Sequence, residues 1–445
     1  MVKEKDTRTV LNRYFKLEER GTNIKTEFLA AITTFLTVSY IILVNPIILS
    51  EAGIPKEAAL AATILAIAVS SIIMGLWANL PIVVGPGMGL NAFFTYTVVL
   101  GQGLSWETAL GAVFISGFVF FILSITGVSS MVVDAIPKTL KASITAGIGL
   151  FIAFVGLRNG GIIVSDPSTF VTLGNIADTG TLLAIGGLIV AAALTVLNVR
   201  GALIISILSV TGISMLIGYS PFPTGFEQVF SLNIPTIQLT FAEMDLRAAI
   251  AYGIFSVIFS FTIVELFDTL ATLIGLTKKA NLTGEDGKVP HMKRALTTGA
   301  LGTMISALFG STAMNTYIEN ATGIAEGGRT GLKAIFAALL FLLTLFIAPF
   351  IQFIPDAATA PVLILIGAFM MTELKEINFG NLTELLPAFL TIIMMPLTFS
   401  IAEGVAFGFI SYTILKLLTR QTKDLHWLMY IIAGAFILNF YMMAH

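Results

Sequence analysis

Long apolar segments separated by short polar ones run through the whole chain. Each is about 20 residues long, the length that an α-helix needs to cross a bilayer core of about 30 Å. The regular alternation of a membrane β-barrel is absent. The pattern predicts an all-α polytopic membrane protein with about fourteen transmembrane helices. The predicted spans are 27–49, 57–77, 82–100, 107–127, 139–157, 181–198, 202–219, 248–277, 293–309, 311–327, 331–352, 359–373, 384–400 and 402–419.

The basic residues give an independent test of this count. Lys and Arg gather in the cytoplasmic loops of helical membrane proteins. If the N-terminus is cytoplasmic, all of the 24 Lys and Arg residues except Lys56, Arg158 and Arg247 fall on the cytoplasmic side. Because one span more or fewer would scramble this partition, we expect fourteen spans and a cytoplasmic N-terminus. A last apolar stretch, 425–443, either adds a fifteenth crossing or lies against the bundle.

Composition narrows the class of protein further. The chain has 445 residues, of which 56% are hydrophobic and 11% charged, and its mean hydropathy is +0.94. A soluble protein carries about 25% charged residues. Without cysteine, the chain has no disulfide, no thiolate nucleophile and no cysteine metal site. A net charge of −2 without a basic patch gives no sign of a nucleic-acid partner, so membrane lipid is the expected surrounding.

The third predicted span is interrupted. It reads GPGMGLNAFFTYT from Gly85, and inside a helix each Gly costs about 1 kcal/mol and each Pro about 3 kcal/mol. The tenth span has a similar interruption, GSTAMNTYIENATG from Gly310. Aligning Asn91 with Asn315 matches the two, and each break lies in the third span of a set of seven. Since an odd repeat length inverts the second copy, we expect a 7+7 inverted repeat with two discontinuous half-helices.

Breaks at matching positions of two halves point to the binding site of a transporter. A half-helix that begins after Gly89 directs free N–H groups and the positive end of its dipole at the middle of the membrane. Irregular backbone at that depth is tolerated only where it is buried in protein or lines a cavity. The alternative is a packing kink made by small residues, which is the weaker interpretation because the breaks form a matched pair.

The eighth span carries a row of polar side chains on one helical face, because they recur every three or four residues. They are Thr262, Glu265, Asp268, Thr269 and Thr272. An ionisable group at the centre of a membrane helix costs about 2.5–3.5 kcal/mol and by default marks a functional site. Two neighbouring carboxylates in low-dielectric surroundings repel each other, so Glu265 and Asp268 are the expected proton-coupling pair. Asp268 either contacts the ligand or supports Glu265.

Together, the breaks and the eighth span predict a polar binding site. Carboxylates accept N–H bonds, and half-helix N–H groups donate to carbonyls or ring nitrogens. A flat, polar, uncharged ligand suits these groups, and Phe93 is placed to stack on its plane. No metal and no cofactor are expected. The candidate substrate-binding residues are Met88, Gly89, Asn91, Phe93, Glu265, Asp268, Thr269, Asn315, Thr316, Tyr317, Ile318, Glu319 and Asn320.

Four motifs in order resemble one known family, and the likeness covers essentially the whole chain. They are YFKLEERGTNIKTEFLAAITTFLTVSYIILVNP, GPGMGLNAFFTYTVV, VELFDTLATLIG and TYIENATGIAEGGRTGL. They resemble the AzgA-like purine permeases, a branch of the nucleobase–cation symporter-2 (nucleobase–ascorbate) superfamily. The resemblance implies uptake of adenine, guanine or hypoxanthine across the plasma membrane, with H⁺ as the expected coupling ion and Na⁺ as the alternative. It implies a transporter and not an enzyme, and it leaves a homodimer open.

The resemblance also implies two domains. Spans 1–4 and 8–11 form a core that moves like an elevator, and spans 5–7 and 12–14 form a gate. A cytoplasmic N-terminal segment precedes them and an apolar C-terminal segment follows. The ranges are 1–26 for the N-terminal segment, 27–127 and 221–352 for the core, 128–220 and 353–424 for the gate, and 425–445 for the C-terminal segment.

Site residues carry over from the bacterial uracil permeases of the wider superfamily. Glu265 falls at the eighth-span carboxylate that holds the base, and Glu319 at the tenth-span carboxylate. Met88 and Gly89 lie near the backbone contact of the third span. The uracil-type histidine one turn after the eighth-span carboxylate is replaced by Thr269, so a proton path through histidine is not expected to carry over.

Three other functions are weighed against this one. A sulfate-permease-type anion transporter has a similar architecture, but two buried carboxylates at the site argue against an anionic substrate. An intramembrane enzyme is disfavoured because HExxH, GxSxG and paired GxGD-type motifs are absent. A channel stays open, and saturable transport with counterflow would exclude it.

Overall fold

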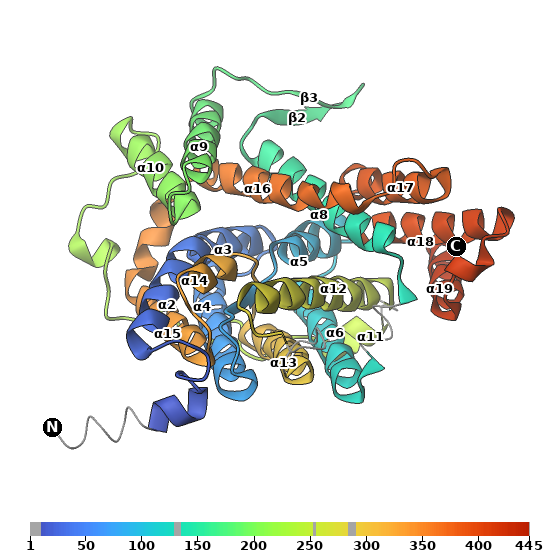
Figure 1. Ribbon diagram of the computed structural model, residues 1–445. Helices are drawn as coiled ribbons and strands as arrows, with labels where there is room; N and C mark the ends of the chain where they lie inside the picture. Colours follow the sequence, from blue (N-terminus) through green and yellow to red (C-terminus); the bar gives the residue numbers. More distant parts are fainter. Residues whose placement is uncertain (1–9, 129–134, 252–254, 284–290, 445) are drawn as a thin grey trace.

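The computed structural model describes residues 10–128, 135–251, 255–283 and 291–444 and is mostly helical (Figure 1). A helix, whole or broken, lies at each predicted span. In the described part of the chain, nine helices are long and apolar enough to cross a membrane: Ile24–Glu51, Lys56–Ala78, Trp106–Thr126, Lys138–Asn159, Thr179–Val196, Val257–Lys279, Gly331–Phe353, Asp356–Glu376 and Ile401–Leu418. Shorter apolar helices are Met88–Gly101, Ala202–Leu216, Leu382–Thr398 and Trp427–Leu438. The chain is therefore a polytopic helical membrane protein, while the number of crossings and the inverted repeat stay predictions.

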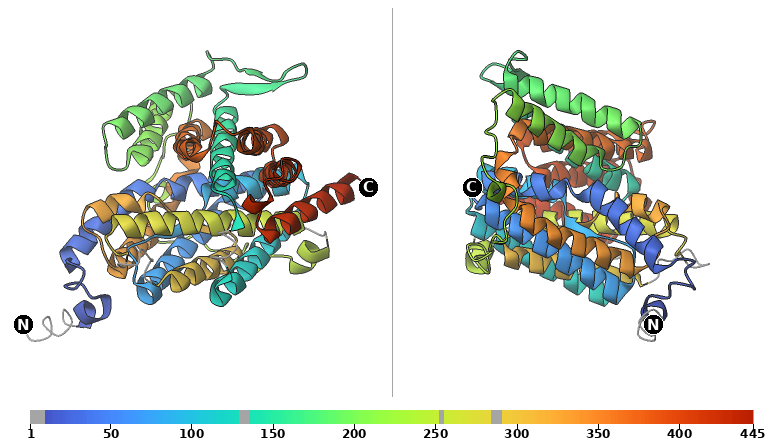
Figure 2. Two further views of the ribbon diagram at one scale, coloured as in Figure 1. Left: turned by 45° about the vertical axis from the view of Figure 1, so that its right-hand side comes forward. Right: turned by 90° about the vertical axis from the view of Figure 1, so that its left-hand side faces the viewer.

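The helices form two groups that lie side by side (Figures 1 and 2). The break group contains both chain breaks. It consists of α2 (Ile24–Val38), α3 (Ile41–Glu51), α4 (Lys56–Ile73), α5 (Met88–Ala92), α6 (Trp106–Thr126), α11 (Leu246–Ala251), α12 (Phe255–Lys279), α13 (Met292–Phe309), α14 (Asn320–Ala325) and α15 (Gly331–Leu343), with strands β1 (Val84–Pro86) and β4 (Met314–Thr316). The flanking group consists of α8 (Lys138–Asn159), α9 (Thr179–Val196), α10 (Ala202–Leu216), α16 (Asp356–Met370), α17 (Leu382–Thr398) and α18 (Ile401–Leu418).

The two groups meet along α5 and α12. Helix α5 packs against α8, and α12 packs against both α8 and α18. A side chain on Gly89 of α5 would collide with Ile148 of α8. The helix that follows the first break therefore lies in close contact with the flanking group, and Gly89 permits this approach.

Polar residues cap several helices at the start of their apolar runs. Ser105 accepts a hydrogen bond from the Thr108 N–H at the start of α6. Asp178 accepts from the N–H groups of Gly180 and Thr181 at the start of α9. Such side chains satisfy N–H groups that have no partner within the first turn of a helix. The polar residues between the predicted spans thus fix where these helices begin.

An exposed β-hairpin connects α8 to α9, and the apolar pattern does not predict it. Its strands are β2 (Ile163–Asp166) and β3 (Phe170–Leu173). The backbone N–H groups of Thr169 and Ser168 donate to the Asp166 carboxylate at 2.9 and 2.8 Å and lower its pKa. The right-hand view of Figure 2 places this hairpin at the opposite end of the helices from the N-terminus.

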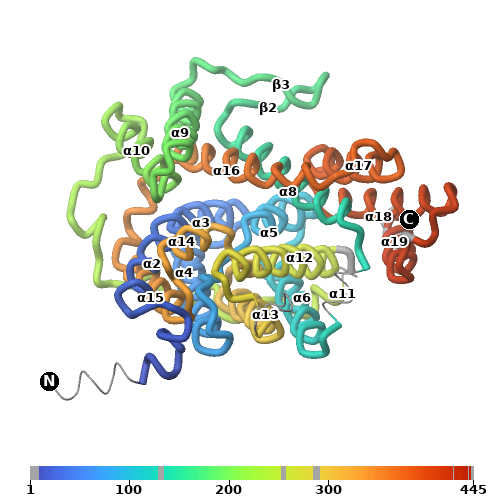
Figure 3. Tube along the Cα trace, viewed as in Figure 1, coloured from blue at the N-terminus to red at the C-terminus, as the bar shows by residue number. Residues whose placement is uncertain are grey.

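The last apolar stretch forms α19 (Trp427–Ala444), below α18 on the right-hand side of Figure 3. It packs along α18. The ring of Phe436 lies 5.3 Å from that of Phe259 in α12 and 6.1 Å from that of Phe409 in α18, centroid to centroid. The stretch therefore contacts both helix groups, and whether it crosses the membrane stays open.

Candidate functional site

Each break contains a short extended segment, and the two segments pair as antiparallel strands β1 and β4. The partners are Val84 with Thr316, Gly85 with Asn315, and Pro86 with Met314. This pairing satisfies backbone groups that would otherwise lack partners inside a membrane. The two asparagines that the alignment matches lie in different elements: Asn315 lies in strand β4, opposite Gly85, and Asn91 lies in helix α5.

A short helix follows each strand. Helix α5 begins at Met88, before the predicted start after Gly89, and continues as a π-helix over Phe93–Gly101. Helix α14 begins at Asn320, with Glu319 at its N-cap position. The third and tenth predicted spans are therefore both interrupted, and two helix N-termini lie just after the paired strands.

Glycines of the first break make room for side chains of the second. A Cβ on Gly87 would lie 2.6 Å from Asn315 Nδ2, and one on Gly85 would lie 2.5 Å from the Tyr317 ring. The Tyr317 hydroxyl donates to the Pro86 carbonyl at 2.7 Å. These glycines thus allow the two breaks to pack against each other.

Asp268 is bound to the second break. The Asn315 side-chain amide donates to Asp268 Oδ2 at 2.6 Å, and the Thr269 hydroxyl donates to Asn315 Oδ1 at 3.4 Å. The Thr316 hydroxyl donates to the Thr269 carbonyl at 3.5 Å. Asn315 is buried and Asp268 is half-buried. A charge-assisted hydrogen bond, stronger than one between neutral groups, therefore joins α12 to the break.

Glu265 faces a different neighbour. Its Oε1 accepts from the Thr303 hydroxyl of α13 at 2.5 Å, and Thr303 accepts in turn from the Met314 N–H at 2.8 Å. Glu265 is fully buried, and its Oε2 has no hydrogen-bond partner among the described residues. The polar row on α12 is thus divided, with Asp268 directed at strand β4 and Glu265 at α13.

Glu319 lies where the second break becomes helix α14. It accepts a hydrogen bond from the Tyr40 hydroxyl at 3.0 Å and is half-buried. The preceding residue, Ile318, is 60% exposed. The following residue, Asn320, is buried, and its side chain accepts from the Val83 N–H at 2.8 Å and donates to the Val83 carbonyl at 3.0 Å. Among these three candidate residues, Ile318 and Glu319 are accessible, whereas Asn320 is bound within the protein.

The candidate residues of α5 are used in internal contacts. Asn91 accepts a hydrogen bond from the Thr312 hydroxyl, and its amide lies 3.9 Å from the Met88 sulfur. Phe93 is fully buried, with its ring centroid 4.8 Å from that of Phe261. Phe93 therefore packs within the break group.

A small cavity of about 20 Å³ lies between the two helix groups. Three candidate residues, Gly89, Asp268 and Asn315, form part of its wall. Its other lining residues are Leu90, Ile144, Thr145, Ile148, Val264, Phe267 and Met370. A cavity of this size holds about one water molecule, whereas ligand pockets enclose about 300 Å³ or more. The cavity is therefore too small to hold a ligand in this conformation.

The sequence did not reveal the flanking-group side of this cavity. Ile144, Ile148 and Met370 belong to apolar runs that look the same whether they face lipid or a site. Of the flanking-group residues that line the cavity, Thr145 is the one with a polar side chain. Only the packing of α8 and α16 against the break group brings these residues to the cavity.

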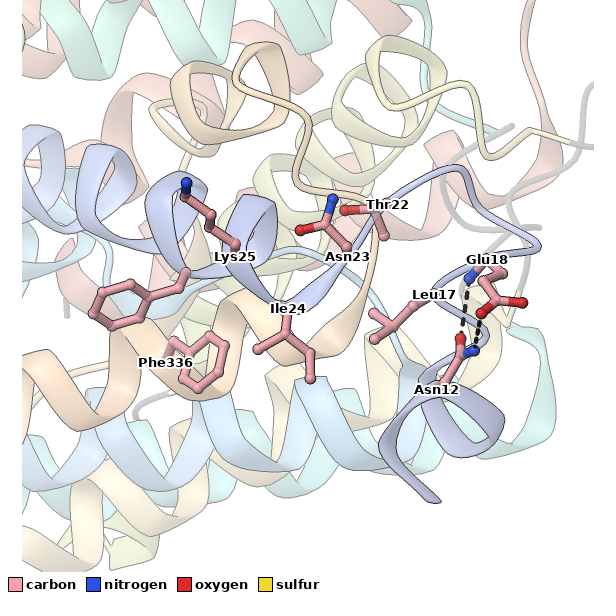
Figure 4. Close-up of a pocket in the computed structure, with 9 residues that line it drawn as sticks. Asn12, Leu17, Glu18, Thr22, Asn23, Ile24, Lys25 and Phe336 are labelled. Carbon is pink, nitrogen blue, oxygen red and sulfur yellow. Dashed lines mark hydrogen bonds between the residues drawn. The ribbon is translucent and has the colours of Figure 1, made fainter. Parts of the chain in front are cut away.

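A larger cavity of about 580 Å³ lies between the N-terminal segment and α15 (Figure 4). Leu17, Asn23, Ile24 and Phe336 are among the residues that line it. The amide of Asn12 donates to Glu18 at its edge. None of the candidate residues lines this cavity, so the smaller one at the breaks is the candidate site.

Residues 25–407 of the chain match the Permease family. The chain belongs to this family. The permease is 47% identical to a putative permease of Methanocaldococcus jannaschii, over 97% of this chain and 98% of the relative. It is 42% identical to the adenine permease AdeP of Escherichia coli (97% and 96%) and 41% identical to the guanine/hypoxanthine permease PbuG of Bacillus subtilis (97% and 99%). The resemblance to the AzgA-like purine permeases is confirmed, and the protein is a transporter and not an enzyme.

The permease also shares its fold with a solved transporter. The transmembrane domain of the cyanobacterial bicarbonate transporter BicA superposes with a TM-score of 0.64, over 87% of this chain and 97% of that domain. The two sequences are 15% identical. At this identity the likeness concerns the fold alone.

Proposed function

We propose that this permease imports purine nucleobases of the adenine, guanine and hypoxanthine class across the plasma membrane, with its N-terminus in the cytoplasm. The observation that carries the proposal is the hydrogen-bonded pair of Asp268 and Asn315 on the wall of the cavity between the helix groups. The relatives named as adenine and guanine/hypoxanthine permeases support the substrate class.

The chemistry of a purine base suits the groups at the breaks. The base is flat and uncharged, and its rim alternates N–H donors with ring-nitrogen and carbonyl acceptors. Asp268 and Glu319 accept N–H bonds as carboxylates, and both are half-buried. Backbone N–H groups at the start of α5, beside Gly89, donate to ring nitrogens or carbonyls. Donors and acceptors of both kinds thus lie at the two breaks and on α12, and Gly89 and Asp268 among them line the cavity.

We assign the coupling ion as H⁺, with Na⁺ as the alternative, and the carboxylates of α12 as its carriers. Glu265 is fully buried and has one oxygen without a partner among the described residues, and Asp268 lines the cavity. A buried charge without full pairing is costly, so proton binding at this pair accompanies base binding. A proton that enters with a neutral base moves one charge, worth about 2.3 kcal/mol per 100 mV, or about fiftyfold accumulation.

We further propose that the break group is the moving core, 27–127 and 221–352, and that the flanking group is the gate, 128–220 and 353–424. The closed cavity supports a movement of one group against the other, because its volume of about 20 Å³ excludes a base. An elevator-like displacement of the core opens the cavity and carries Asp268 with it.

Polar contacts join the two groups at one end. Glu51 of α3 accepts a hydrogen bond from the Asn159 amide of α8 at 3.2 Å, and Arg158 lies 3.5 Å from Glu51. The Asn159 amide also donates to the Tyr96 hydroxyl at 3.1 Å. A movement of the core along the gate breaks these contacts, so they oppose it in the conformation described.

A thermal-shift screen of the purified protein tests the proposed substrate class. Adenine, guanine or hypoxanthine raises the melting temperature by binding the folded state, whereas uracil, sulfate and bicarbonate do not. The fold shared with BicA makes an anion transporter the second candidate. Stabilisation by bicarbonate or sulfate, without stabilisation by purines, would establish that candidate instead. Saturable uptake with counterflow in proteoliposomes then excludes a channel.

A further inference from the structure

Lys333 of α15 is a fully buried lysine that lies outside the candidate site. Its ammonium group donates to the Pro81 carbonyl at 2.8 Å, to Asn320 Oδ1 at 3.1 Å and to the Asn320 carbonyl at 3.3 Å. An ammonium group has three N–H donors. All three therefore have acceptors, and these acceptors belong to the segments that lead into the first break and out of the second.

Two glycines keep space for the Lys333 side chain. A Cβ on Gly323 of α14 would lie 2.7 Å from Lys333 Cε, and one on Gly328 would lie 2.9 Å from Lys333 Cδ. Both glycines belong to the TGIAEGG stretch after the second break. The lysine stem thus passes along α14 in a channel that larger residues would fill.

Asn320 connects Lys333 to the first break. The Asn320 side chain bonds both the N–H and the carbonyl of Val83, and it also donates to the Tyr317 carbonyl at 2.8 Å. Val83 directly precedes strand β1, so these bonds continue the β1–β4 pairing by one step. Lys333 donates to the same Asn320 oxygen that accepts from the Val83 N–H, and so helps to fix the orientation of the amide.

The Glu27 carboxylate lies near the Lys333 ammonium group but does not form a salt bridge with it. Glu27 of α2 is fully buried and accepts from the backbone N–H groups of Arg329 at 2.8 Å and Lys333 at 3.2 Å, at the start of α15. Among the described residues, no carboxylate lies within 4.0 Å of Lys333 Nζ. The ammonium group is thus free to bind the carbonyl and amide oxygens of the two breaks.

We propose that Lys333 is a positioning residue for the substrate site: it holds the N-terminus of α14, and with it Glu319, against the first break. The inference rests on the proposed function for its binding readout. Glu319 directly precedes Asn320, so a shift of Asn320 moves the carboxylate that accepts the N–H groups of the base. An unbranched apolar side chain such as Met fills the same channel, so packing alone does not require the charge.

The test compares Lys333→Met with Lys416→Met. Lys416 is a buried lysine of α18 that donates to Gln421 at 2.7 Å, away from the breaks. Lys333→Met removes the hydrogen bonds to Pro81 and Asn320, so we expect about tenfold weaker purine binding for this variant. Lys416→Met lowers the melting temperature but leaves the affinity unchanged. Equal affinity of Lys333→Met and the wild type would overturn the proposal.

A double-mutant cycle shows whether Lys333 acts through Asn320. If it does, Lys333→Met and Asn320→Ala should each weaken binding about tenfold. The double variant should then also bind about tenfold more weakly than the wild type, and not about a hundredfold more weakly. Independent, multiplicative effects would contradict the proposed route. If Lys333→Met does not fold, Gly328→Ala displaces the lysine stem while keeping its charge, and unchanged affinity of that variant overturns the proposal.

A readout without ligand separates this inference from the proposed function. Because the chain has no cysteine, Ile318→Cys introduces a single thiol at an exposed position in the second break. We expect Lys333→Met, but not Lys416→Met, to change the labelling rate of that thiol severalfold. Equal labelling rates in both backgrounds contradict a positioning role, even if the protein binds no purine. Absence of purine binding by the wild type would contradict only the proposed function.

Discussion

The side-chain amide of Asn315 donates a hydrogen bond to Asp268 at 2.6 Å. Asn315 stands opposite Gly85 in the paired strands, and Asp268 lies on the continuous helix α12. One bond thus connects both chain breaks to the carboxylate that faces the flanking group. A base that binds Asp268 therefore acts, through Asn315, on the paired strands of the two breaks.

Asp268→Asn should abolish high-affinity binding. The variant places an amide donor opposite the Asn315 donor and removes an acceptor for the base, a buried mismatch that costs about 1–3 kcal/mol. We expect about tenfold to hundredfold weaker binding in isothermal titration of the detergent-solubilised protein.

Glu265→Gln is the matched control for this change. Its remaining oxygen can still accept from Thr303, so binding and counterflow should survive in part. It mimics a protonated carboxyl group, so accumulation driven by a pH gradient should disappear. If Glu265→Gln still concentrates purine in response to the gradient, Asp268, Glu319 or a sodium ion carries the coupling instead.

Glu319→Gln should lose most affinity at every pH. Glu319 offers the base two acceptor oxygens, one of which also accepts from Tyr40, and Gln replaces one of them with a donor. Tyr40→Phe removes only the supporting hydroxyl, so its loss of affinity should be several times smaller than that of Glu319→Gln. Titration at pH 5.5, 7 and 8.5 checks both variants, and equal affinities of Glu319→Gln and the wild type would remove Glu319 from the site.

The helical ranges were predictable from the sequence because bilayer thickness fixes the length of an apolar run. The breaks were predictable because Gly85, Pro86 and Gly87 disfavour a helix in such a run. The register of their strands was not, because strand pairing across more than 200 residues leaves no local pattern.

The polar face of α12 was predictable from spacing, but its division between partners was not. Side chains three residues apart on a helix differ in direction by about 60°, so Glu265 and Asp268 share a face but still bind different neighbours. Phe93 could not be placed either, since an aromatic residue in an apolar span packs in the core as readily as it faces a ligand. The hairpin between α8 and α9 lies in a polar segment that the apolar pattern leaves undefined.

Gly87→Ala should uncouple the two breaks. Its methyl group would lie 2.6 Å from the Asn315 amide and push it away from Asp268. We expect at least tenfold weaker binding with normal membrane insertion, because the cost is confined to one contact. Gly212→Ala in α10, where no atom lies within 4 Å of the added carbon, is the control and should bind as the wild type does. If Gly87→Ala binds with wild-type affinity, the prediction is wrong, and binding tolerates a wider separation of the two breaks.

Arg158→Gln should speed the movement between the helix groups without changing affinity. It removes the contact with Glu51 and the stacking of Arg158 over the Tyr96 ring at 5.1 Å. The side chains are 42% and 30% exposed, so the pair contributes only about 0.2–1 kcal/mol and the rate should rise up to about fivefold. Lys16→Gln, which breaks an ion pair within the N-terminal segment, is the control. Counterflow rates and KM in proteoliposomes check this, and a changed KM with an unchanged rate would contradict it.

Uptake of labelled hypoxanthine or adenine into proteoliposomes, with an imposed inward proton gradient and a matched Asp268→Asn sample, tests the central claim most directly. The account predicts saturable accumulation by the wild type that collapses when the gradient is dissipated. Unlabelled bases should inhibit it at concentrations at which the corresponding nucleosides do not. At the same substrate concentration, Asp268→Asn should accumulate much less base than the wild type. Gradient-driven uptake that nucleosides inhibit equally well, or that Asp268→Asn retains in full, would contradict a purine-base site at Asp268.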